Sequence, residues 1–87
     1  MSIRPIEEMY RRGNIRRDGR GRLVIRVSTR TIRLPGSEVT CLGTLRDALT
    51  RRGLLRRKQI EVVCTPHERT ERLLFGPKPT VGLAALV

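Results

Sequence analysis

The chain has almost no aromatic side chains: one tyrosine, one phenylalanine and no tryptophan among 87 residues. Its core must therefore be built mainly from Leu, Ile and Val. The scarcity of aromatic residues also disfavours binding of single strands and sequence-specific binding of RNA, because proteins with these functions stack bases on aromatic rings. We expect any nucleic acid to be contacted through its backbone.

Residues that commonly perform catalysis or hold metals are scarce as well. The sequence has one histidine, His67, and two cysteines, Cys41 and Cys64. A fourth zinc ligand and the paired CxxC spacing of structural zinc sites are missing. No spacing selects a nucleophile with its base. We therefore expect no enzyme activity, metal, cofactor or small-molecule substrate, and two buried free thiols rather than a disulfide.

Long apolar runs are absent too. No stretch approaches the roughly 20 apolar residues that cross a bilayer, and residues 1–12 are polar, with Glu7 and Glu8 among them. Such a segment does not resemble a secretory signal. The sequence predicts a soluble cytoplasmic protein without a membrane partner.

Acidic residues are few, and basic residues are many. Nineteen Lys and Arg face eight Asp and Glu, which gives a formal net charge of +11. All of the basic residues except Lys58 and Lys78 are arginines, whose planar guanidinium binds phosphate, guanine or carboxylate through paired hydrogen bonds. This excess favours a polyanionic partner, although arginine-rich codon usage would produce the same composition.

The basic residues form two clusters along the chain. The first runs from Arg11 to Arg33 and contains one acid, Asp18; the second surrounds residues 51–58. We predict a nucleic-acid-binding role for these residues in the two clusters: Arg11, Arg12, Arg16, Arg17, Arg20, Arg22, Arg26 and Arg30, then Arg51, Arg52, Arg56, Arg57 and Lys58. Changing Arg16, Arg17 and Arg20 together to Ala is expected to abolish binding without disturbing the fold.

The patterning predicts a small α+β domain with a curved, mostly antiparallel sheet of about four to five short strands and one central helix. We assign residues 1–12 to an N-terminal arm or short helix, 13–76 to a single basic α+β domain and 77–87 to an apolar tail.

Turn residues and apolar spacing locate the elements. Asp18-Gly19 predicts a hairpin turn between strands 14–17 and 22–28, and Leu23, Ile25 and Val27 alternate as on the buried face of a strand. Thr44 and Gly53 suit the two ends of a helix over about 45–52. We further predict extended structure over 29–34, a turn at Pro35-Gly36, and strands over 39–42, 59–65 and 70–75. A helical turn is the less favoured interpretation of 70–75.

Two partial resemblances bear on the fold. One resemblance is to the AbrB/MraZ swapped-hairpin DNA-binding family, and it is carried by Asp18, Gly21-Arg22, the helix at 45–49 and the predicted strand pair over 59–75. In this chain some 18 residues, about 27–44, separate the strand from the helix. The segment LVIRVSTRTIRLPGSEVTCLGTLRDAL is similar to the strand–strand–helix opening of β-grasp domains, but the chain ends without the Gly-Gly of sulfur carriers. Neither resemblance identifies a family.

These observations predict a non-enzymatic protein that binds duplex DNA through an arginine-rich β-hairpin, as a homodimer and with a role in transcription regulation. Two alternatives stay open. One is a small adaptor or inhibitor, of the viral or mobile-element type, that binds an acidic protein surface. The other is an RNA- or ribosome-associated factor.

Overall fold

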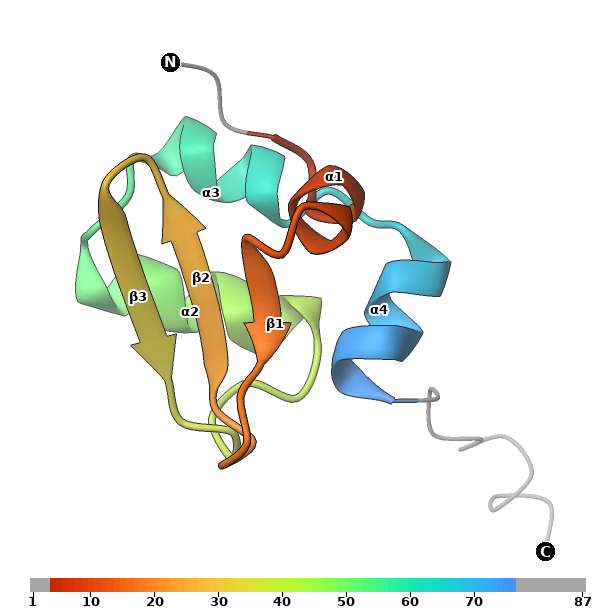
Figure 1. Cartoon of the computed structure of the whole chain (residues 1–87). Coiled ribbons are helices and arrows are strands. Elements are labelled where there is room, and N and C mark those ends of the chain that lie inside the picture. The colour runs from red at the N-terminus through yellow and green to blue at the C-terminus, as the bar shows by residue number, and fades with distance from the viewer. Residues whose placement is uncertain (1–3, 77–87) are drawn as a thin grey trace, which may run out of the picture.

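The computed structural model describes residues 4–76. This part contains one antiparallel sheet in the order β1-β2-β3, and helices that follow and precede it in the chain (Figure 1). The elements are α1 (Ile6–Arg11), β1 (Ile15–Arg17), β2 (Leu23–Val27), β3 (Arg30–Leu34), α2 (Leu42–Arg52), α3 (Arg57–Val63) and α4 (Glu68–Phe75). The fold is α+β, as predicted, but it has three strands and four helices in this part, not four to five strands and one helix.

The predicted hairpin between β1 and β2 is confirmed. Arg17 pairs with Leu23, and the intervening loop is organised by the carboxylate of Asp18. That carboxylate accepts backbone N–H groups from Arg20 and Arg22, both at 2.9 Å, and the Arg22 guanidinium at 2.8 Å. Desolvation raises the pKa of Asp18, but these hydrogen bonds outweigh it, so the pKa lies below its ordinary value.

A second chain reversal, which the turn residues did not predict, follows β2. Ser28 and Thr29 form a two-residue loop between β2 and β3, so the segment does not continue as a single extended stretch. Ser28 adopts a φ of 58°, a conformation that a non-glycine residue uncommonly adopts. The sequence lacks the Asn-Gly or Asp-Gly pair that normally announces such a turn.

The two faces of the sheet differ. Ile15, Ile25 and Ile32 lie side by side on one face and are at most 2% exposed. Helix α2 packs behind this face, and its Leu45 and Leu49 complete the core. The opposite face is not covered by any described helix (Figure 1).

Helix α2 begins earlier than predicted. It starts at Leu42, so the strand predicted over 39–42 is wrong. Thr44 lies within the first turn, where its hydroxyl accepts the backbone N–H of Thr40 at 2.9 Å and that of Cys41 at 3.0 Å. The predicted end is confirmed, because Gly53 adopts a left-handed φ of 63°.

The strands predicted over 59–65 and 70–75 are wrong, because both segments are helical. The alternation of Ile60, Val62 and Cys64 suggested a strand, yet Ile60, Val63 and Cys64 are the buried residues, at helical spacing. Pro66 and His67 separate the two helices, and the imidazole Nδ1 of His67 accepts the Thr70 N–H at the start of α4. The less favoured helical reading of 70–75 was therefore correct.

The short N-terminal helix is confirmed as α1. Ile6 and Met9 are buried in the same core as the sheet, so this segment is not a free arm. The tail predicted over 77–87 lies outside the described residues.

One arginine joins three parts of the chain. The guanidinium of Arg17 donates to the carbonyl oxygens of Gly21 in the hairpin (2.9 Å), Val39 before α2 (2.6 Å) and Leu74 in α4 (2.9 Å). It also lies 5.6 Å from the ring centroid of Phe75. Arg17 thus ties α4 and the β3–α2 loop to the sheet.

The fork shape of Arg17 is expected to matter more than its charge. Replacing Arg17 with Lys keeps the charge but removes most of the carbonyl contacts, so the free energy of unfolding should fall by about 2 kcal/mol. Urea denaturation measures this loss. The matched control is Arg16→Lys, which should change stability by less than about 0.5 kcal/mol; equal losses in the two variants would contradict the assigned role.

Gly36 lies against the Gly21 carbonyl in the hairpin loop. A Cβ at Gly36 would lie 2.5 Å from the carbonyl oxygen of Gly21, which also accepts Arg17. Gly36→Ala should therefore force the backbone apart and destabilise the protein by about 2 kcal/mol or more. The control is Gly19→Ala, because nothing lies within 4 Å of a Cβ at Gly19. Similar melting temperatures for the two variants would contradict the close approach.

Candidate nucleic-acid interface

The uncovered face of the sheet carries arginines from all three strands. Paired residues in adjacent strands share a face, so Arg16, Val24 and Arg33 form one row and Arg26 and Thr31 form the next. All three arginines are exposed. Val24 is only 8% exposed although no helix covers it, which indicates that the neighbouring arginine stems shield it.

The charges on this outer face are not neutralised by the described part of the chain. No ion pair within residues 4–76 involves Arg16, Arg26 or Arg33. Arg20, at the exposed hairpin tip, is likewise absent from these ion pairs. We call the surface formed by Arg16, Arg26 and Arg33 the arginine face.

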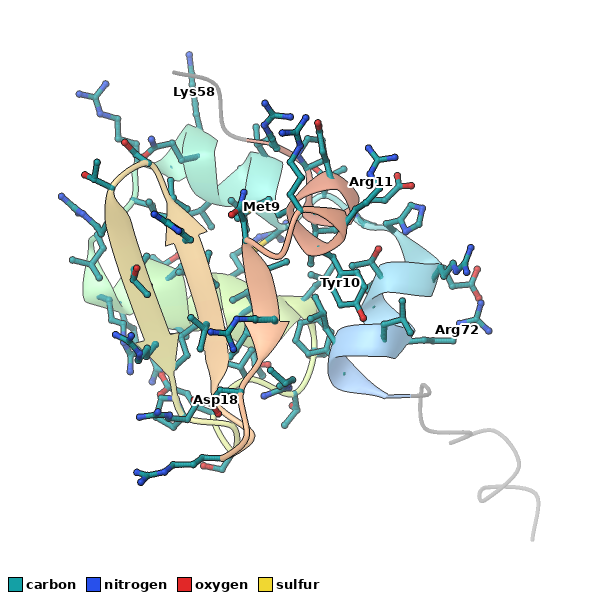
Figure 2. All side chains as sticks on the ribbon, viewed as in Figure 1. Met9, Tyr10, Arg11, Asp18, Lys58 and Arg72 are labelled. Atoms are coloured by element: carbon teal, nitrogen blue, oxygen red, sulfur yellow. The ribbon has the colours of Figure 1, made fainter. Side chains whose placement is uncertain are left out.

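Several residues of the first predicted cluster are engaged elsewhere. Arg17 bonds three carbonyl oxygens, Arg22 pairs with Asp18, and Arg30 donates to the Leu54 carbonyl at 2.8 Å. Arg12 pairs with Glu8 at 3.3 Å on α1. Arg11 also lies on α1, far from the hairpin tip marked by Asp18 (Figure 2). The cluster in the sequence is therefore dispersed in space.

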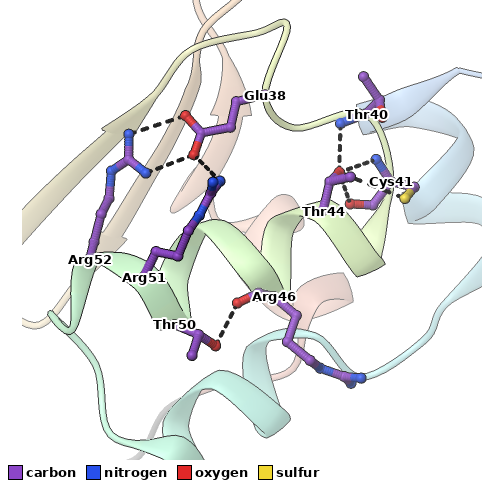
Figure 3. Close-up of polar contacts among 8 residues, drawn as sticks. All are labelled: Glu38, Thr40, Cys41, Thr44, Arg46, Thr50, Arg51 and Arg52. Carbon is purple, nitrogen blue, oxygen red and sulfur yellow. Dashed lines mark hydrogen bonds and ion pairs between the residues drawn. The ribbon is translucent and has the colours of Figure 1, made fainter.

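The second predicted cluster also divides. Arg51 and Arg52 both bind the Glu38 carboxylate, with nitrogen–oxygen distances of 2.6 Å and 2.9 Å (Figure 3). The hydrogen bond from Arg52 is the main cause that lowers the pKa of Glu38. Arg56 precedes α3, while Arg57 and Lys58 are exposed in its first turn, where the helix dipole disfavours cations.

Arg33 is the residue that the sequence prediction left out of the binding set. It belongs to the first cluster, yet only the strand pairing places it level with Arg16 across the sheet. Ile32 and Leu34, on either side of it, are buried, and this alternation was the available signal.

The cysteines differ from each other. Both are free, as predicted, but only Cys64 is buried, and the prediction that Cys41 is buried is wrong. Hydrogen bonds from Thr44 lower the pKa of the exposed Cys41 thiol, whereas burial raises that of Cys64 to about 11. Among residues 4–76, no three His, Cys, Asp or Glu side chains group together as metal ligands.

This difference predicts selective alkylation. With limiting iodoacetamide near pH 7.5, Cys41 should be modified at least about tenfold faster than Cys64. A larger fraction of the Cys41 thiol is ionised, and Cys41 is more exposed to the reagent. Peptide mass spectrometry under native conditions measures the ratio, and the same reaction in urea is the control in which the difference should largely disappear. Equal native rates would show that Cys64 is accessible.

Comparisons with protein families, curated proteins and solved structures gave no match to this chain. The strand pair that the AbrB/MraZ resemblance implied is replaced by α3 and α4. The strand–strand–helix order of the β-grasp resemblance is present as β2-β3-α2, and the next element is again a helix. Within the described residues, none of the helices combines the length and apolar character needed to span a membrane.

Proposed function

We propose that this protein is a non-enzymatic binder of nucleic acid and that the arginine face is its contact surface. The observation that carries the proposal is that Arg16, Arg26 and Arg33 share the uncovered face of the sheet, are exposed and have no acidic partners among residues 4–76. Phosphates would neutralise these guanidinium groups and release condensed counterions.

Duplex DNA is the favoured ligand because the described surface offers no aromatic stacking platform. Tyr10 and Phe75 are both partly buried against the core, and Phe75 lies against Arg17. The stems of Arg16 and Arg33 are separated by two strand spacings, roughly 10 Å. This span is comparable to the roughly 12 Å width of the DNA major groove, so the two side chains can reach phosphates on both of its sides.

The proposal differs from the hairpin prediction in its residues. Arg17 and Arg22 are replaced by Arg33, since both have internal partners. Arg20 at the tip and Arg57 with Lys58 on α3 are auxiliary positions. A homodimer and a role in transcription regulation stay part of the proposal, as does cytoplasmic location.

The test is a triple variant of the arginine face. Changing Arg16, Arg26 and Arg33 to Gln should weaken binding to a duplex DNA of about 20 base pairs by at least about a hundredfold near 100 mM salt. The slope of log affinity against log salt should also decrease by about 2 to 3, since three phosphate contacts are lost. Fluorescence anisotropy measures both quantities, with single-stranded DNA and duplex RNA as parallel ligands.

A control variant distinguishes the effect of losing the arginine face from the effect of lowering the net charge. Arg46→Gln, Arg69→Gln and Arg72→Gln together remove the same charge from exposed positions on α2 and α4. This variant should lose affinity by less than about fivefold. Equal losses in the two triple variants, or an affinity of the native protein that does not depend on salt, would contradict the proposed surface.

A further inference from the structure

The outer edge of β3 is not paired with another strand among residues 4–76. β3 is the last strand of the described sheet, and the loop after α2 approaches only its beginning, where Arg30 donates to the Leu54 carbonyl (Figure 1). The opposite edge strand, β1, is flanked by α1 and by α4, whose Leu74 carbonyl bonds Arg17. An unprotected edge presents N–H and C=O groups that can pair with another strand.

The register identifies which groups face outward. In a two-residue hairpin the residues that flank the loop form a hydrogen-bonded pair, here Val27 and Arg30. Pairing alternates from there, so the N–H groups of Thr31 and Arg33 point away from β2. The N–H of Arg26, opposite Thr31, confirms the alternation because it donates at 2.7 Å to Asn14 on the β1 side.

The side chains around this edge are basic. Arg33 and Arg26 lie on the outer face beside it, and Arg30 lies at its beginning. A hollow of about 280 Å³ continues from that end and is lined by Arg30, Arg56 and Leu54, among other residues. Leu54 is 41% exposed, so the hollow offers an apolar contact together with two cations.

We propose that the outer edge of β3 binds an extended acidic peptide segment of a partner protein, which pairs with Thr31 and Arg33 as a fourth strand. Main-chain hydrogen bonds would supply the pairing, and the surrounding arginines would select carboxylates over neutral or basic side chains. A second copy of the chain is disfavoured at this edge, because it would bring its own Arg30 and Arg33 to the contact. The inference does not depend on nucleic-acid binding.

The experiment uses two acidic peptides of eight residues on the full chain. One alternates Glu and Val, which favours a strand; the other is all Glu, which offers more charge without strand propensity. The alternating peptide should bind about tenfold more tightly, as one or two net hydrogen bonds would give. Amide exchange measured by NMR should slow at Thr31 and Arg33 with the alternating peptide and stay unchanged there with the other.

Matched variants locate the pairing. Thr31→Pro removes an outward N–H without removing a bond to β2, so it should abolish the slowed exchange at Arg33 and the tenfold preference. Thr31→Val keeps the N–H and should behave as the native chain. A third test leaves the protein unchanged and methylates the backbone nitrogen of every second peptide residue. Methylation of the residues whose N–H groups face β3 should block binding, and methylation of the residues between them should not.

Two outcomes would overturn the proposal. The first is binding of the two peptides with equal affinity and no slowed exchange at Thr31 and Arg33. The second is slowed exchange at these amides without peptide that increases with protein concentration, which would assign the edge to a second copy. Failure of DNA binding leaves the peptide results unaffected, so the two proposals are separable.

Discussion

The structure depends on the guanidinium of Arg17, which hydrogen-bonds three carbonyl oxygens from three separate segments. A domain of this size buries only a modest fraction of its surface, so its apolar core alone is marginal. The described sheet has three short strands, and its edge strand β1 has three residues. A polar fastening at the end of β1 therefore fixes α4 and the β3–α2 loop where apolar contacts are few.

The position of Arg17 in its strand explains why it differs from its neighbour. Arg17 lies in the row of Leu23 and Leu34 on the covered face, whereas Arg16 lies with Val24 and Arg33 on the open face. Successive residues of a strand point to opposite faces. Two adjacent arginines of one basic run thus have different roles, one in holding the fold together and one in presenting charge to solvent.

The other basic residues also fall into two groups: some pair with acidic side chains, and others are exposed to solvent without such a partner. Glu38 is bound by Arg51 and Arg52, and Asp18 is bound by Arg22. These two acids thus fix loops, and the charges of the arginine face and of the β3 edge are left without acidic partners among residues 4–76. A polyanion or an acidic strand would find these charges already arranged, which lowers the conformational cost of binding.

The sequence by itself determined the charge, the scarcity of aromatics, the β1–β2 hairpin, the buried alternation of Leu23, Ile25 and Val27, and the end of α2 at Gly53, because each is set by composition or by local backbone chemistry. Only the tertiary structure decided that 57–63 is a helix, since its apolar residues fit two periodicities and packing against α2 selects one. It also decided which arginines share a face. Strand pairing joins Arg16 to Arg33 across residues distant in the chain. The local alternation around Arg33 indicates which face of its strand it occupies, but not that it lies level with Arg16.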